Sequence, residues 1–131
     1  ASRNRIKLYD AITVQHGGTA NRTLDASGTV NVLVMLNPPL LVAGMDAGTV
    51  EVFTSMAREP TRIYSSPNNA SVMDMVALAN GGLAVGFDDG SVIIWHHPVL
   101  PPWNRYVQLQ ASGEVYCLTE LPDKRLAVGS Y

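Results

Sequence analysis

The chain has 131 residues, which suits one domain, and its 15% of charged residues is below the roughly 25% of an average soluble domain. A formal charge of −2 gives no global attraction to nucleic acid or to an anionic membrane, and no apolar run approaches the roughly 18 residues of a membrane span. The single cysteine excludes an internal disulfide framework and argues against a cysteine-built zinc site, so we expect a cytoplasmic, globular domain.

In chain order, the apolar runs and turn signals predict strands throughout. The expected strands lie at about 4–10 and 20–25, then four within 29–66, four within 71–110, and two at 114–121 and 125–130. No window of eleven residues keeps a convincing helical period. The sequence therefore predicts an all-β chain of twelve strands.

The clearest strand signals lie within 71–110. An apolar run ends at Asn80-Gly81-Gly82, a second run ends at Asp88-Asp89-Gly90, and a third, Ser91 to Trp95, is rich in β-branched and aromatic residues. Asp-Asp-Gly is a strong hairpin signal because glycine readily adopts a positive φ. These signals predict a four-stranded antiparallel meander.

The sequence also repeats itself. Residues 40–53 align with residues 82–95 at an offset of 42, which places Gly44 on Gly86 and Phe53 on Trp95. A third copy begins at 124–131, where Gly129 lies 43 residues beyond Gly86. Because Phe53 and Trp95 end the third strand of each copy, we expect both to be buried.

The period, the four strands and the stretch LAVGFDDGSVIIW (83–95) together resemble the WD-repeat β-propeller family. The Trp-Asp dipeptide of that family is missing, since Thr54 and His96 follow the aromatic residues, and so is its Gly-His pair. With blade strands named a to d from the centre outwards, the resemblance implies a partial propeller over residues 1–131. Its parts are a half blade (1–25, strands c and d), two blades (26–67 and 68–110) and a half blade (111–131, strands a and b).

Twelve strands are the material of three blades, whereas propellers typically close with four to eight. Two explanations remain open. The chain is a fragment of a longer propeller, or two copies close a six-bladed homodimer in which the first two strands of each chain complete the last two of the other.

The resemblance implies a non-enzymatic protein-interaction scaffold that binds a peptide or protein segment on the face of the d–a and b–c loops. Met45 and Phe87 end the second strands at that face, where they would either contact a ligand or pack between blades. Asp46 and Asp88 follow them and would favour a basic or amine-bearing partner. On the opposite face, Trp103 ends a proline-rich loop that would serve recognition or pack on its own blade.

Two other functions remain as alternatives. One is a structural joint within a larger assembly; the other is a propeller enzyme with a central-channel site, for which the inner strands offer mainly Asp74, Glu114 and Glu120. We expect no cofactor and no metal. Adjacent strand residues such as His96 and His97 point to opposite faces, and Asp88-Asp89 is explained by turn geometry, while Cys117 lies in an apolar run that predicts a buried thiol.

Overall fold

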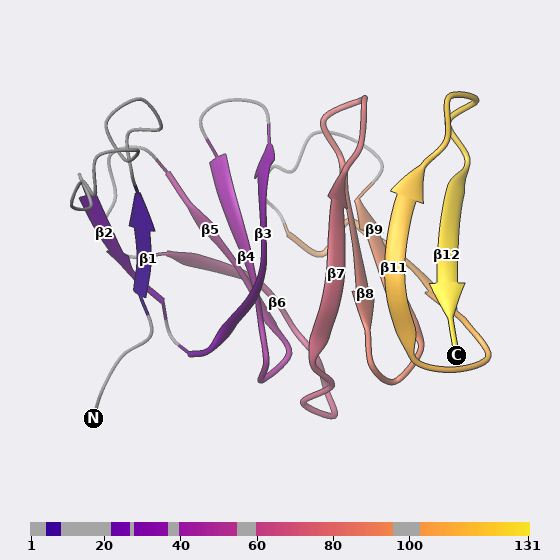
Figure 1. Cartoon of the computed structure of the whole chain (residues 1–131), viewed down its shortest axis with the longest axis horizontal. Coiled ribbons are helices and arrows are strands. Elements are labelled where there is room, and N and C mark those ends of the chain that lie inside the picture. Colours follow the sequence, from indigo (N-terminus) through magenta and orange to yellow (C-terminus); the bar gives the residue numbers. More distant parts are fainter. Residues whose placement is uncertain (1–4, 9–21, 27, 37–39, 55–59, 96–102) are drawn as a thin grey trace, which may run out of the picture.

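The computed structural model of the chain describes residues 5–8, 22–26, 28–36, 40–54, 60–95 and 103–131. These residues form twelve strands and no helix, which confirms the prediction of an all-β chain (Figure 1). None of the described residues forms a helix that could span a bilayer. The strands are β1 (Arg5–Leu8), β2 (Arg22–Asp25), β3 (Val30–Leu36), β4 (Leu40–Met45), β5 (Thr49–Phe53), β6 (Thr61–Ser65), β7 (Val72–Ala77), β8 (Leu83–Phe87), β9 (Ser91–Trp95), β10 (Val107–Gln110), β11 (Val115–Glu120) and β12 (Leu126–Ser130).

The strands form four antiparallel sheets that follow one another along the chain. The first sheet is β1–β2, the second β3–β4–β5–β6, the third β7–β8–β9–β10 and the fourth β11–β12. Within each sheet every strand pairs with its neighbour in sequence, so the predicted four-stranded meanders and the two-stranded sheets at both ends are confirmed. Figure 1 shows the first and fourth sheets at opposite ends of the row.

Three hydrophobic clusters hold the sheets together, one at each junction between neighbours. Ile6, Leu24 and Phe53 belong to the cluster between the first and second sheets. The largest cluster joins the second and third sheets and contains Trp95, and a smaller one joins the third and fourth. Phe53 is 1% exposed and Trp95 2%, which confirms that both aromatic residues are buried.

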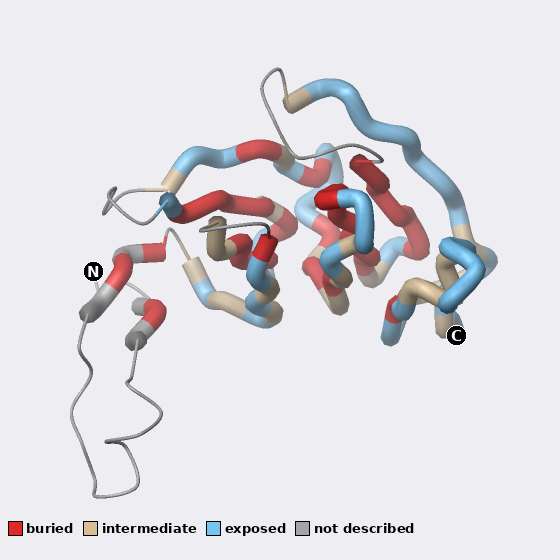
Figure 2. The backbone as a smooth tube through the Cα atoms, turned by 90° about the horizontal axis from the view of Figure 1, so that it is seen from above, coloured by how far each residue is buried: buried red, intermediate tan, exposed pale blue. Residues whose placement is uncertain are grey.

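Both middle sheets therefore bury side chains on two faces. Figure 2 shows the buried backbone concentrated in the centre of the row and the exposed backbone toward the C-terminal end. Strands β8 and β9 are buried at every residue, whereas β12 is exposed or half-buried throughout. Because both faces of these sheets are buried, the sequences of their second and third strands are continuous apolar runs and do not alternate between apolar and polar residues.

The first strands of three sheets share an irregularity at the same position of the repeat. The pairing register shifts between Val30 and Val32, between Val72 and Asp74, and between Val115 and Cys117. Each shift leaves one extra residue in the first strand, which is a β-bulge. The extra residues are Asn31, Met73 and Tyr116, and they occupy one position of the repeat.

The thiol of Cys117 is exposed, so the prediction of a buried thiol was wrong. Cys117 directly follows the bulge at Tyr116, which interrupts the simple alternation of faces along β11. The fourth sheet contacts the third on one face, and no described strand covers its other face.

Candidate functional site

Five connections meet at one end of the sheets, along the lower edge of Figure 1. Their described residues are 26, 28–29, 46–48, 66–71, 88–90 and 111–114, and we call them together the acidic end. They contain the carboxylates Asp46, Asp88, Asp89 and Glu114, and neither lysine nor arginine. By contrast, the described connections at the other end of the sheets hold Arg105, Lys124 and Arg125 together with one carboxylate, Asp123. Among the described connections the two ends therefore differ in charge, although the whole chain is nearly neutral.

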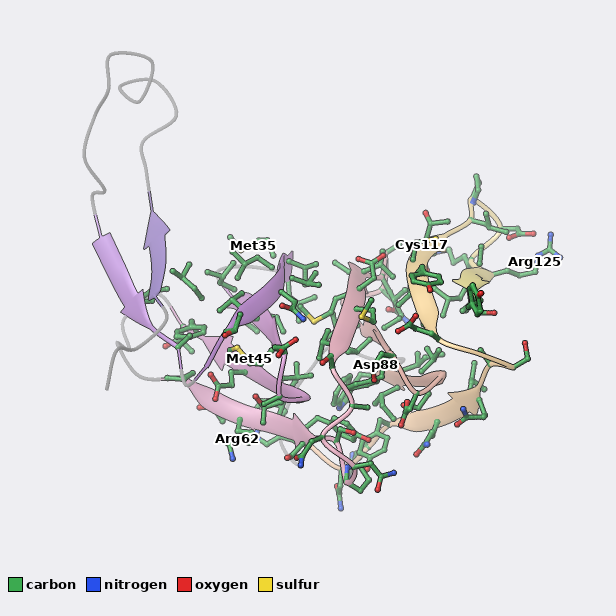
Figure 3. The ribbon with its side chains drawn as sticks, turned by 60° about the horizontal axis from the view of Figure 1, so that its bottom comes forward. Met35, Met45, Arg62, Asp88, Cys117 and Arg125 are labelled. Carbon is green, nitrogen blue, oxygen red and sulfur yellow. The ribbon has the colours of Figure 1, made fainter. Side chains whose placement is uncertain are left out.

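Two of the residues expected at this surface are inside the protein. Met45 and Phe87 are both 0% exposed. Met45 packs in the cluster between the first and second sheets, and Phe87 packs between the second and third, with its ring 5.5 Å from that of Tyr64. Figure 3 labels Met45 among the side chains between the sheets. Of the two alternatives, ligand contact or packing, the structure shows packing for both side chains.

The two aspartates that follow them are brought together by one serine. The Ser71 hydroxyl donates to the main-chain carbonyl of Asp46 at 2.5 Å and lies 3.2 Å from its carboxylate. The main-chain N–H of Ser71 donates to the carboxylate of Asp88 at 3.2 Å, and the N–H of Asp88 donates back to the carbonyl of Ser71 at 3.0 Å. Asp46 belongs to the second sheet and Asp88 to the third, so Ser71 fixes two carboxylates of neighbouring sheets beside each other.

Asn31 is a third contributor that sequence reasoning missed. Asn31 is the bulged residue of β3. Its side-chain amide donates to the main-chain carbonyl of Val72 at 3.1 Å and to the carboxylate of Asp46 at 3.4 Å. Within the described part of the chain, the carboxylate of Asp46 accepts hydrogen bonds through one of its two oxygens, and so does the carboxylate of Asp88. Each therefore keeps an oxygen that can accept from a ligand.

A further carboxylate of this end, Glu114, lies beside two tyrosines. The hydroxyl of Tyr116 hydrogen-bonds to Glu114, and this bond raises the pKa of the Tyr116 phenol above its usual value. The ring of Tyr116 lies 6.1 Å from that of Tyr131 in an edge-on arrangement, and these side chains are 48% and 87% exposed. An exposed aromatic face beside a carboxylate suits a cation.

Trp103, the candidate on the opposite face, is half-buried against the cluster between the second and third sheets. Its main-chain carbonyl accepts a hydrogen bond from the indole N–H of Trp95 at 3.1 Å. Residues 96–102 of the same loop, including His96 and His97, lie outside the described residues. The described part of this loop packs on its own sheet.

Two of the three carboxylates considered for a catalytic site accept hydrogen bonds from the main chain of a neighbouring sheet. Asp74 accepts from the N–H of Leu118, and Glu120 accepts from the N–H of Ala79, both at 2.8 Å. Glu114 directly precedes β11 and Glu120 ends it, so the two lie six residues apart, which corresponds to about 20 Å of extended chain. Among the described residues no three His, Cys, Asp or Glu side chains form a cluster that could hold a metal. Asp89 caps its own turn by accepting from the main chain of Ser91 at 2.9 Å.

A scan against protein-family models finds no match to this chain, and a search of curated proteins finds no significant match.

Proposed function

We propose that the chain is part of a WD-repeat-like β-propeller and serves as a protein-interaction scaffold. The four-stranded meanders, the bulge shared by three first strands and the cluster at every junction between sheets support this architecture. In this interpretation each four-stranded sheet is a blade, and the first and fourth sheets are half blades. A rigid stack of sheets that carries its loops at two ends suits recognition of another protein.

The partner that the surface fits best is an extended, basic segment of a peptide or protein, bound at the acidic end. One observation carries this proposal: the five connections of that end hold four carboxylates and no lysine or arginine. Asp46 and Asp88 flank Ser71 and would accept hydrogen bonds from lysine or arginine side chains of one ligand. Tyr116 would add a contact between its ring and a cation. The apolar contacts first expected from Met45 and Phe87 form no part of this proposal.

The test compares two labelled peptides of equal length, one alternating lysine with glycine and one alternating glutamate with glycine. We expect the lysine peptide to bind and its association to slow as salt is added, because exposed charges mainly steer the encounter. The double variant Asp46→Asn/Asp88→Asn keeps an acceptor oxygen for the bonds from Ser71. We expect it to bind the lysine peptide about tenfold more weakly, which is about 1.4 kcal/mol.

Asp123→Asn is the matched control, because Asp123 is an exposed carboxylate at the other end of the sheets, where it pairs with Arg125 at 2.6 Å. We expect this variant to bind the lysine peptide as the unmodified chain does. Equal binding of the two peptides, or equal losses in the variant and the control, would show that the acidic end is not the binding surface.

A second candidate function, a structural joint within an assembly, is favoured by a separate observation. Among the described strands, β1 pairs only with β2 and β12 pairs only with β11. Both strands therefore present an edge that can receive another strand.

A further inference from the structure

The second, third and fourth sheets share one main-chain contact at the acidic end. In each of them the residue before the first strand accepts, through its carbonyl, the N–H of the residue after the second strand. The pairs are Thr29 with Asp46, Ser71 with Asp88 and Glu114 with Tyr131, at 2.9, 3.0 and 2.8 Å. The backbone frame is therefore the same in the three sheets, and what differs is the set of side chains that it carries.

The fourth sheet carries aromatic rings on this frame. In the second sheet the bulged residue, Asn31, donates its amide to the carboxylate of Asp46. In the fourth sheet the bulged residue is Tyr116, and its ring lies 6.1 Å from that of Tyr131 at an interplanar angle of 77°. The carboxylate of this sheet belongs to Glu114, to which the hydroxyl of Tyr116 hydrogen-bonds. The fourth sheet therefore presents a carboxylate beside a tyrosine ring where the second presents a carboxylate beside an amide.

Tyr116 is accessible to a ligand because of its place in the bulge. It is 48% exposed. Asn31 at the same position of the second sheet is also exposed, and Met73 in the third sheet is half-buried, although both of these sheets pack against a neighbour on each face. The bulge therefore keeps its side chain at least partly accessible in a sheet that is covered on both faces.

The carboxylate of Glu114 can accept further hydrogen bonds. An ionised carboxylate offers about four lone-pair sites, and the hydroxyl of Tyr116 occupies one of them. None of the described lysines or arginines forms an ion pair with Glu114. A ligand therefore meets a carboxylate that can accept two parallel N–H bonds, with the face of an aromatic ring beside it.

A guanidinium group matches both features at once. It is planar, donates two parallel N–H bonds to one carboxylate and stacks on aromatic rings, whereas an ammonium group is a compact, strongly hydrated charge without a flat face. We propose that Glu114 and Tyr116 form a subsite that selects arginine over lysine in the basic segment bound at the acidic end.

This inference rests on the binding function proposed above and adds a specificity to it. The bulges of the second and third sheets hold Asn31 and Met73, which offer no ring beside Asp46 and Asp88. Those two carboxylates therefore accept from either cation, and only the carboxylate of the fourth sheet distinguishes arginine from lysine.

The first experiment measures, by fluorescence anisotropy, the binding of labelled peptides that carry three cations. Stacked sheets lie about 10 Å apart, which is about three residues of extended chain, so the parent peptide has three lysines separated by pairs of glycines. Arginine then replaces an end lysine or the middle one. We expect arginine at an end to lower the dissociation constant at least about fivefold, and arginine in the middle to change it less than about twofold. Equal binding of all the peptides, or equal gains at the end and in the middle, would overturn the proposal.

The second experiment tests which side chains make the distinction. Glu114→Gln keeps an acceptor for the hydroxyl of Tyr116 and removes the charge, and Tyr116→Leu removes the ring. We expect either change to bring the dissociation constants of the lysine and arginine peptides to within about twofold of each other.

Glu120→Gln is the matched control. Glu120 ends the same strand at the other end of the sheets, and the new amide keeps an acceptor for the N–H of Ala79. This variant should retain the full preference for arginine. A preference that persists in Glu114→Gln or in Tyr116→Leu, or that falls equally in the control, would show that the subsite lies elsewhere.

Failure of this inference is distinguishable from failure of the proposed function. If the lysine peptide binds and the arginine peptides bind equally well, the acidic end is a binding surface without an arginine subsite. If no peptide binds, both proposals are wrong. The variant Asp46→Asn/Asp88→Asn should weaken the binding of the lysine and arginine peptides by the same factor, so the ratio of their dissociation constants reports the subsite alone.

Discussion

Gly44 and Gly86 show how a single residue sets the distance between sheets. A Cβ added to Gly86 would lie 2.5 Å from Cγ1 of Val115, and one added to Gly44 would collide in the same way with Val72. Each valine is the first residue of the next sheet's first strand. Glycine at this repeat position therefore lets the following sheet approach closely, and a larger residue would push it away.

We expect Gly86→Ala to destabilise the fold by roughly 1–3 kcal/mol, because the added methyl group overpacks the junction between the third and fourth sheets. The free energy of unfolding in denaturant measures the effect. Gly28→Ala is the matched control, because nothing lies within 4 Å of a Cβ placed at Gly28. Equal stability of the two variants would contradict the role of Gly86 as a spacer.

Single residues also show what the sequence can predict of the candidate site. Phe53 and Trp95 could be assigned to the core because the repeat gives their strand position. Met45 and Phe87 could not be placed, since a large apolar residue at a strand end suits either packing or binding, and only the neighbouring sheet decides. Asn31 and Ser71 were missed because their role depends on a bulge and on a contact between sheets that sequence spacing does not reveal.

At the scale of elements, one carboxylate joins two sheets. Asp74 in β7 accepts the N–H of Met75 with one oxygen at 2.9 Å and the N–H of Leu118 in β11 with the other at 2.8 Å. The equivalent positions hold Val32 in β3 and Cys117 in β11. This bond supplements the hydrophobic cluster between the third and fourth sheets, which has fewer buried residues than the cluster at the preceding junction.

Replacing Asp74 by alanine should lower the free energy of unfolding by roughly 1–3 kcal/mol, because the N–H of Leu118 loses its acceptor. Asp74→Asn retains an acceptor oxygen and should cost less than the alanine variant. Thermal or denaturant unfolding measures both. If the two variants were equally stable to within about 0.5 kcal/mol, the bond to Leu118 would not contribute to stability.

The strands themselves were predictable because their signals are local. Glycine at positive φ in the turns, 91° at Gly48 and 87° at Gly90, and apolar runs of strand length gave all twelve strands within a few residues. The exposed thiol of Cys117 was not predictable, because burial of β11 depends on how many sheets flank it.

At the scale of the whole molecule, the order of the sheets followed from the repeat, but the number of sheets that pack together did not. Contacts between repeats of this kind join only neighbours, so the sequence of one repeat carries no information about how many repeats pack in one array. Among the described strands, β1 pairs only with β2 and β12 only with β11, which agrees with the two-stranded sheets expected at both ends.

The three separate clusters have a consequence for how the protein opens. Since each sheet is held only by its neighbours, the molecule should behave as a one-dimensional array whose units open locally, those at the ends before those in the middle. Amide hydrogen exchange read by mass spectrometry should then be slowest in β4, β5, β8 and β9 and fastest in β1–β2 and β11–β12. Uniform protection in a monomeric sample would contradict this gradient.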